Sequence, residues 1–211
     1  MHHLINTTVF CLLLVPVLAL AGAVDAKDAL VERLNSLKSM QAEFEQHTVN
    51  ERGEVINTSL GSLALVSGGK FNIATRAPFP QLLVADGVDL YSYDEDLNQV
   101  IVKPLGQNIK QVPILLFGNT NLGFLEDYKV SQHVLDNGAD AEFSLQPRIP
   151  DSVFETLILS FDAATPSSLT MTDSLGQVTS IQFSDVQINH TIPEATFQYV
   201  VPEGVDLIDD R

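Results

Sequence analysis

The spacing of apolar residues changes early in the chain, and the change separates a helical start from a sheet-forming remainder. Between residues 28 and 46 apolar positions recur at steps of three or four, at Leu30, Leu34, Leu37, Met40 or Gln41, and Phe44. This step is the period of one helix face, and Asp28 is a suitable N-cap residue. We therefore predict an amphipathic helix over residues 28–46. Its apolar face must pack on another element, because a lone helix of this length is unstable in water.

From about residue 60 apolar and polar residues alternate, which is the period of a strand. Leu63 and Leu65 belong to one such run, Phe71 and Ile73 to the next, and the glycines of Ser67–Lys70 suit a hairpin turn between them. Further short strands are expected at residues 82–85, 90–93, 98–102, 128–132, 141–146, 156–161, 168–173, 178–183 and 197–200. The pattern predicts a mainly β chain, folded as one antiparallel sheet that is strongly curved or nearly closed.

Pro113–Gly118 interrupts the alternation with a compact apolar segment that is framed by proline and glycine. We expect a short helix or helical lid there.

The first 26 residues are typical of a secretory leader. An apolar run, Val9–Leu20, is followed by the small residues of 21–26. Cleavage is possible after Ala23 or after Ala26, and we favour Ala26 because the helical pattern starts directly behind it. The prediction is a cleaved signal peptide at 1–26 and one domain at 27–211. An uncleaved membrane anchor is the alternative, and Pro16 and the shortness of the apolar run disfavour it.

Charge and cysteine content narrow the function. The chain has 27 acidic and 11 basic residues, a net charge of −16, which repels nucleic acid and anionic membrane surfaces. Its one cysteine, Cys11, lies in the leader and follows Phe10, where lipid attachment needs a small residue. After cleavage no disulfide, thiolate nucleophile or cysteine-based metal site is possible. Because of the strongly negative charge, we expect no nucleic-acid partner.

Residues that carry chemistry are sparse. His47, His133 and His190 are isolated and form no metal-binding spacing. There is no Gly-x-Ser-x-Gly elbow, phosphate loop or dinucleotide motif, and residues 94–96 are typical of a solvated acidic turn. We predict no enzyme, metal or cofactor, although a Ser-His-Asp triad assembled by the fold stays open. Taken alone, these residues predict an exported β-rich binding or interaction domain, because apolar stripes fit a filled core as well as a ligand cavity.

Several segments, in order through nearly all of the mature chain, resemble the outer-membrane lipoprotein carrier protein family (LolA). Tyr91–Val100 resembles its aromatic-x-Tyr-Asp-x-x-Leu-x-Gln-Val segment, and Val84–Gly87 its Val-x-Asp-Gly turn. The other matching pieces are the start of the chain around Leu34 to Gln46, Gly61–Leu65, Lys70–Phe71, Asp173–Gln177, Phe197 and Pro202–Asp206.

The resemblance implies a single unclosed antiparallel β-barrel that is covered by a short helical lid. It implies a monomeric periplasmic chaperone without activity of its own. Such a chaperone accepts acylated lipoproteins from an inner-membrane ABC transporter and delivers them to an outer-membrane receptor. The cavity wall would then be Leu63, Leu65, Phe71 and Ile73, and the lid would be Leu30, Leu34, Leu37, Ile114, Leu115 and Phe117.

One departure concerns the lid. The family carries Arg-Pro before the hairpin phenylalanine, and that arginine holds the lid shut, but Ser67–Gly68 stands here. We expect Arg76 to substitute, with Lys70 as the alternative. Three other functions stay open: a lipidated outer-membrane receptor, a periplasmic sensor of lipid or lipoprotein with a similar barrel, and an exported hydrolase. The first lacks its attachment cysteine here, and the second normally has an additional domain.

Overall fold

The computed structural model describes residues 25–105, 113–118, 122–135, 139–149 and 154–211. In chain order the elements are the helix α1 (Ala26–Ser36), the strands β1 (Ser39–Val49), β2 (Val55–Val66), β3 (Lys70–Ala77), β4 (Gln81–Asp86), β5 (Asp89–Asp94) and β6 (Gln99–Pro104), the 3-10 helices η2 (Pro113–Gly118) and η3 (Leu122–Asp127), the strands β7 (Tyr128–Val134), β8 (Ala141–Pro147), β9 (Thr156–Asp162), β10 (Thr165–Thr172) and β11 (Val178–Ile188), the 3-10 helix η4 (Glu194–Phe197) and the strand β12 (Asp206–Asp209).

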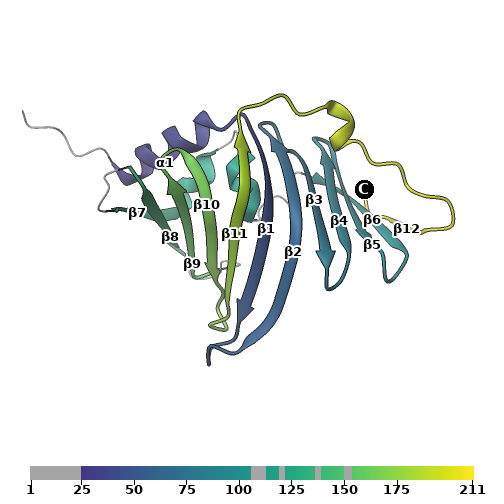
Figure 1. Ribbon diagram of the computed structural model, residues 1–211, viewed down its shortest axis with the longest axis horizontal. Coiled ribbons are helices and arrows are strands. Elements are labelled where there is room, and N and C mark those ends of the chain that lie inside the picture. Colours follow the sequence, from purple (N-terminus) through teal and green to yellow (C-terminus); the bar gives the residue numbers. More distant parts are fainter. Residues whose placement is uncertain (1–24, 106–112, 119–121, 136–138, 150–153) are drawn as a thin grey trace, which may run out of the picture.

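The described strands form one curved sheet in the order β12-β6-β5-β4-β3-β2-β1-β11-β10-β9-β8-β7 (Figure 1). All neighbours are antiparallel except β12 and β6, which run parallel at one edge. The two edge strands, β12 and β7, are not paired with each other, so the barrel stays open. The predicted unclosed, mainly antiparallel half-barrel is confirmed, and the parallel edge pair is an addition to it.

The predicted helix over 28–46 is wrong in its second half. Helix α1 ends at Ser36, its N-cap is Asp25 and its C-cap is Leu37. Residues 39–49 form β1, the central strand, which pairs with β2 on one side and β11 on the other. Met40 and Phe44 lie four residues apart, a spacing that fits a helix, but with Ala42 they also fit the two-residue period of a strand. Hydrogen bonds to two neighbours decided between the two periods.

Most other predicted elements are confirmed with shifts of a few residues at their ends. Pro113–Gly118 is helical, as expected, in the 3-10 form. The predicted strand over 197–200 is wrong, because η4 ends at Phe197 and no strand follows until β12. Strand β12 was not predicted: among the described strands its four residues pair with the distant β6 alone.

The sheet has an inner and an outer face with different coverings. The inner face carries the main apolar cluster, to which α1 and η2 contribute. The outer face carries a small cluster of Ala64, Ile192 and Phe197 beneath the C-terminal segment. Figure 1 shows α1 beside β7–β10 and the C-terminal segment passing over the other half of the sheet to β12.

Candidate functional site

Strand register gathers the predicted wall residues on the inner face. Leu63 pairs with Ile73, and Leu65 pairs with Phe71. Directly opposed residues in an antiparallel pair share a face, so these four side chains form one patch. Leu63, Leu65 and Phe71 are buried, and Ile73 is half-buried at the border of the same cluster.

The predicted lid residues whose side chains are described pack against the wall residues in the same inner-face cluster. Leu30 and Leu34 of α1 are buried, as are Leu37 directly after the helix and Ile114 of η2. The side chain of Leu115 lies outside the described residues.

Phe117 of η2 is fully buried. Its ring meets Phe161 edge-to-face at a centroid distance of 5.9 Å and Phe183 at 5.7 Å. Edge-to-face pairs contribute beyond their buried area. The chain's own helical segments therefore fill the inner face.

A margin of half-buried apolar residues surrounds this filling. Leu83, Met171, Ile181 and Phe183, like Ile73, pack against the buried cluster but keep part of their surface accessible. An apolar ligand that entered would meet these side chains first, before displacing the fully buried ones. The margin is the accessible part of the candidate site.

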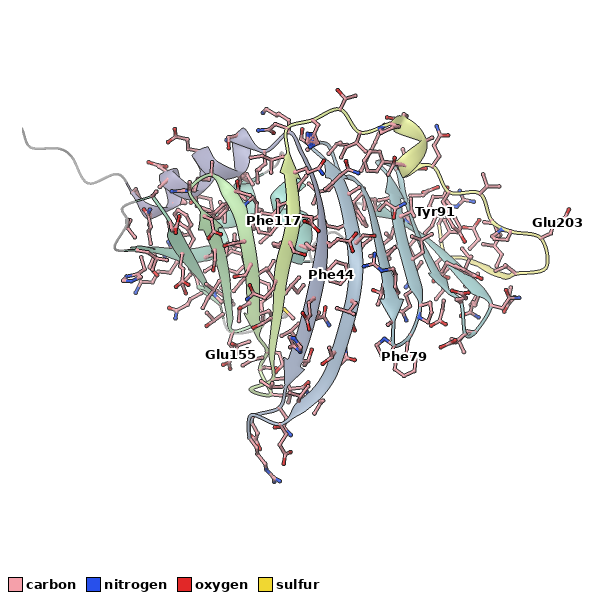
Figure 2. The ribbon with its side chains drawn as sticks, in the orientation of Figure 1. Phe44, Phe79, Tyr91, Phe117, Glu155 and Glu203 are labelled. Carbon is pink, nitrogen blue, oxygen red and sulfur yellow. The ribbon has the colours of Figure 1, made fainter. Side chains whose placement is uncertain are left out.

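Gly61, which was not among the predicted site residues, fixes the packing at the centre of the sheet beside Leu63. It pairs with Phe44 on one side and Thr75 on the other. A Cβ at this position would lie 2.3 Å from Cζ of Phe44 and 2.4 Å from the carbonyl oxygen of Ala74. The aromatic ring thus lies against the glycine backbone, and Figure 2 labels Phe44 and Phe117 near the central strands. A lone glycine inside an alternating strand was the available signal.

Arg33, which was not predicted as a site residue, attaches α1 to the β8–β10 side of the sheet. Its guanidinium donates hydrogen bonds to the carbonyl oxygens of Ala163 and Ala139, the latter at 3.3 Å. Its Cζ lies 5.7 Å from the ring centroid of Phe143 and 5.5 Å from that of Phe161. A single arginine in a polar helix face gives no sequence signal for such distant partners.

The other end of α1 is bound to η3 by an exposed ion pair. Lys27 Nζ lies 2.7 Å from Glu126 Oε1. This hydrogen bond lowers the pKa of the Glu126 carboxyl and raises the pKa of the Lys27 ammonium. Exposed pairs of this kind contribute little to stability, so this contact positions α1 only weakly.

The two predicted latch residues have partners on the outer face. Arg76 forms an ion pair with Glu43 and donates to the carbonyl oxygen of Gly61 at 3.4 Å. Lys70 forms an ion pair with Glu194 of η4. Neither pair includes a residue of α1 or η2.

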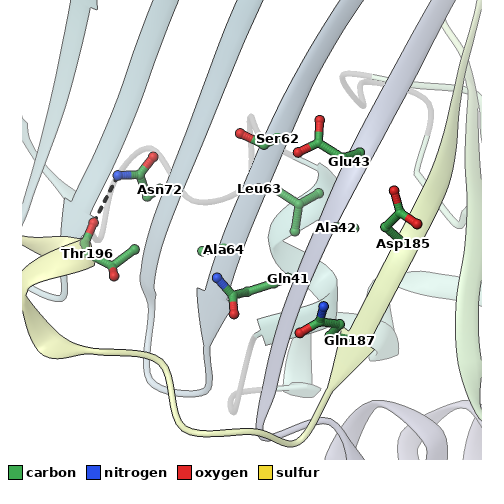
Figure 3. A pocket seen from close by; sticks show the side chains of 10 residues that line it. All are labelled: Gln41, Ala42, Glu43, Ser62, Leu63, Ala64, Asn72, Asp185, Gln187 and Thr196. Carbon is green, nitrogen blue, oxygen red and sulfur yellow. Dashed lines mark hydrogen bonds between the residues drawn. The ribbon is translucent and has the colours of Figure 1, made fainter.

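A polar hollow of about 530 Å³ lies on the outer face, between the middle strands and η4. Figure 3 shows it from close by, with the Asn72 amide donating to the carbonyl oxygen of Thr196 at 2.9 Å. Amides and carboxylates dominate its lining, among them Gln41, Glu43 and Asp185. This chemistry does not suit an acyl chain, so the apolar inner face is the better candidate site.

Neither a metal-binding cluster nor a membrane-spanning helix is found among the described residues. The described residues contain no group of three or more His, Cys, Asp or Glu side chains placed to hold a metal ion. No helix in the same part of the chain is long and apolar enough to cross a membrane.

The open sheet and the helical filling of its apolar inner face place the chain in the class of half-barrel proteins with a lid. The model of the family "Outer membrane lipoprotein carrier protein LolA" matches residues 35–200. The chain belongs to this family.

Two relatives illustrate the match. The outer-membrane lipoprotein carrier protein of Alcanivorax borkumensis is 35% identical over 188 residues, which cover 89% of each chain. That of Hahella chejuensis is 37% identical over 181 residues, 86% of this chain and 87% of that one. Among solved structures, the crystal structure of MucB superposes with a TM-score of 0.52 at 16% identity, over 89% of this chain and 66% of that one. At that identity the likeness concerns the fold alone.

Proposed function

We propose that this protein is a periplasmic chaperone that carries acylated lipoproteins between membranes. It accepts them from an inner-membrane ABC transporter and delivers them to an outer-membrane receptor. The proposal depends on one observation. Among the described residues, helical segments cover the apolar inner face, where a sandwich would have a second sheet. Membership of the lipoprotein carrier family supports it.

The energetics of acyl chains explain why such a filling suits a carrier. An exposed acyl chain costs about 0.8 kcal/mol per CH₂ in water, so it needs an apolar shelter of comparable area. In the empty protein the leucines of α1 and the aromatic ring of η2 occupy that shelter. Cargo and lid then compete for the same surface, and binding amounts to a shift between closed and open states.

Handover requires that the shelter hold its cargo without specific polar contacts. The inner face offers a large cluster of apolar side chains, and an affinity that comes from their burial depends little on cargo identity. A receptor that offers a similar apolar surface can therefore take the chains over. The net charge of −16 favours release from anionic membranes and docking to basic patches on partners.

We also propose that a leader is removed on export. The Asp25 side chain accepts a hydrogen bond from the Lys27 amide at 3.0 Å, and the Asp25 carbonyl accepts one from the Ala29 amide. Cleavage after Ala26 would remove this cap, whereas cleavage after Ala23 would keep it. An N-cap contributes roughly 1 kcal/mol to a helix, so the cap supports the earlier cut.

A release assay tests the proposed function. The purified mature protein is added to spheroplasts that synthesise a labelled outer-membrane lipoprotein, and the supernatant is analysed for a one-to-one complex. We expect release only when the protein is present. If the transporter is active and the folded protein releases nothing, the carrier function is refuted.

A matched pair of variants tests the site in the same assay. Ile73→Glu places a charge on the accessible margin of the inner face and should reduce release strongly. Val88→Glu places the same charge on a turn residue that is 74% exposed and should leave release unchanged. Circular dichroism confirms that both variants are folded.

A further inference from the structure

One cation, Arg33, joins α1 to the half of the sheet formed by β7–β10, beside which the helix lies. Arg33 lies in the last turn of α1. The carbonyl of Ala163 belongs to the turn between β9 and β10, and the carbonyl of Ala139 lies just before β8. The two acceptors belong to separate connecting segments at the β8–β10 side of the sheet, so lifting α1 breaks both hydrogen bonds together.

The acceptor side of this contact is fixed in place. The Ala163 amide donates to Oδ1 of Asp140 at 2.8 Å, and Ala163 has a φ of +52° in its tight turn. The Arg33 guanidinium also lies over the rings of Phe143 and Phe161, both of which are buried. A planar guanidinium suits two carbonyls and two ring faces at once, whereas a lysine ammonium matches neither geometry well.

No other charged contact described for α1 reaches the sheet. Lys27 binds Glu126 of η3, which is itself a peripheral element. Arg76 and Lys70 bind partners on the outer face. Ser67 and Gly68, which stand where the family has Arg-Pro, have no charged side chain that could hold the lid.

We propose that Arg33 is the latch of the lid: a positioning residue that holds α1 on the inner face in the empty protein. The proposal rests on the proposed carrier function. Cargo that enters must displace Leu30 and Leu34 and also break the bonds of Arg33. The latch therefore weakens cargo binding, and it promotes release at the receptor because α1 closes as the cargo leaves.

Four variants of the mature chain separate this latch from the alternatives. Arg33→Leu removes it, and Arg33→Lys keeps the charge without the forked geometry. Lys27→Gln breaks the exposed pair on the same helix as a matched control. Arg76→Leu tests the latch on the outer face.

The first readout is amide hydrogen exchange of α1 in the empty protein, which reports lid opening directly. We expect Arg33→Leu to accelerate exchange in α1 by about tenfold, as removal of hydrogen bonds from a charged group predicts. Arg33→Lys should lie between Arg33→Leu and wild type, and the other two variants should match wild type. Melting curves establish that each variant is folded.

The second readout is the dissociation constant of a dansylated fatty acid, together with the rate of lipoprotein transfer to a receptor. Arg33→Leu should bind the probe about tenfold more tightly, because opening costs less, and transfer should slow. Unchanged exchange and affinity in Arg33→Leu overturn the latch, as does an open lid in Arg76→Leu alone. If wild type releases no lipoprotein from spheroplasts, the carrier function fails, while hydrogen exchange still decides whether Arg33 holds α1.

Discussion

Replacing Leu30 by alanine separates a lid from an ordinary core. Leu30 lies on α1 and is 0% exposed within the inner-face cluster. Truncation of a buried leucine costs about 2–5 kcal/mol, made up of a transfer and a cavity contribution. If α1 lifts as a lid, the destabilisation is limited by the free energy of lid closure, and we expect about 2–3 kcal/mol. For a domain of this size, 1 kcal/mol corresponds to roughly 2–4 °C in Tm, so the Tm of the empty protein should fall by roughly 5–10 °C.

The same substitution should improve ligand binding. A truncated side chain in the closed lid competes less strongly with an acyl chain, so the reduction in the free energy of closure appears as affinity. At about 1.4 kcal/mol per factor of ten, a reduction of about 2–3 kcal/mol means that a dansylated fatty acid should bind up to roughly 30- to 140-fold more tightly. Calorimetric unfolding and a fluorescence titration on the same sample measure the two effects.

Val100→Ala provides the control, because Val100 is also 0% exposed but lies outside the inner-face cluster. It should lower Tm and leave the affinity for the probe unchanged. If Leu30→Ala lowered both stability and affinity, α1 would be a permanent part of the core and the competition between lid and cargo would be refuted.

Three further predictions concern other parts of the molecule. Gly61→Ala places a Cβ 2.3 Å from a ring carbon of Phe44 and should cost about 1–3 kcal/mol in the free energy of unfolding; an unchanged denaturation midpoint would contradict the packing described. Hydrogen bonds from Arg211 lower the pKa of the Asp209 carboxyl from 3.8 to about 2, so this contact favours the folded state above pH 3.8 and is lost as the pH falls towards 2. An NMR titration should show this low pKa, and Arg211→Gln should return it to near 3.8. Mass spectrometry of the exported protein should find Val24 as its first residue, and a start beyond the Asp25 cap would contradict the proposed cut.

The central strand shows where sequence periodicity reached its limit. The spacing of Met40, Ala42 and Phe44 satisfies a helix and a strand at once, and the predicted helix was wrong beyond Ser36. Register pairs Met40 with Leu65 of β2 and with Ile188 of β11. Pairing over such sequence distances is set by the whole sheet, and no local window contains it.

The lid residues show the same limit for the site. The leucines of α1 have helical spacing and could be assigned to a lid from the resemblance. Arg33 has no such pattern, because its acceptors are backbone carbonyls, which every residue carries. Only the tertiary fold brings the turn at Ala163 beside α1.

The sequence by itself determined the local features of this protein: alternating strands, glycine-containing turns, an apolar start, a strongly negative charge and family motifs in order. These follow from local periodicity and composition, which act over a few residues. The tertiary structure decided where these segments lie relative to one another. It placed β1 at the centre, left β7 and β12 as unpaired edges of an open barrel, and put α1 and η2 on the apolar face. Those outcomes depend on packing between segments far apart in the chain, where burial and hydrogen bonding outweigh local preference.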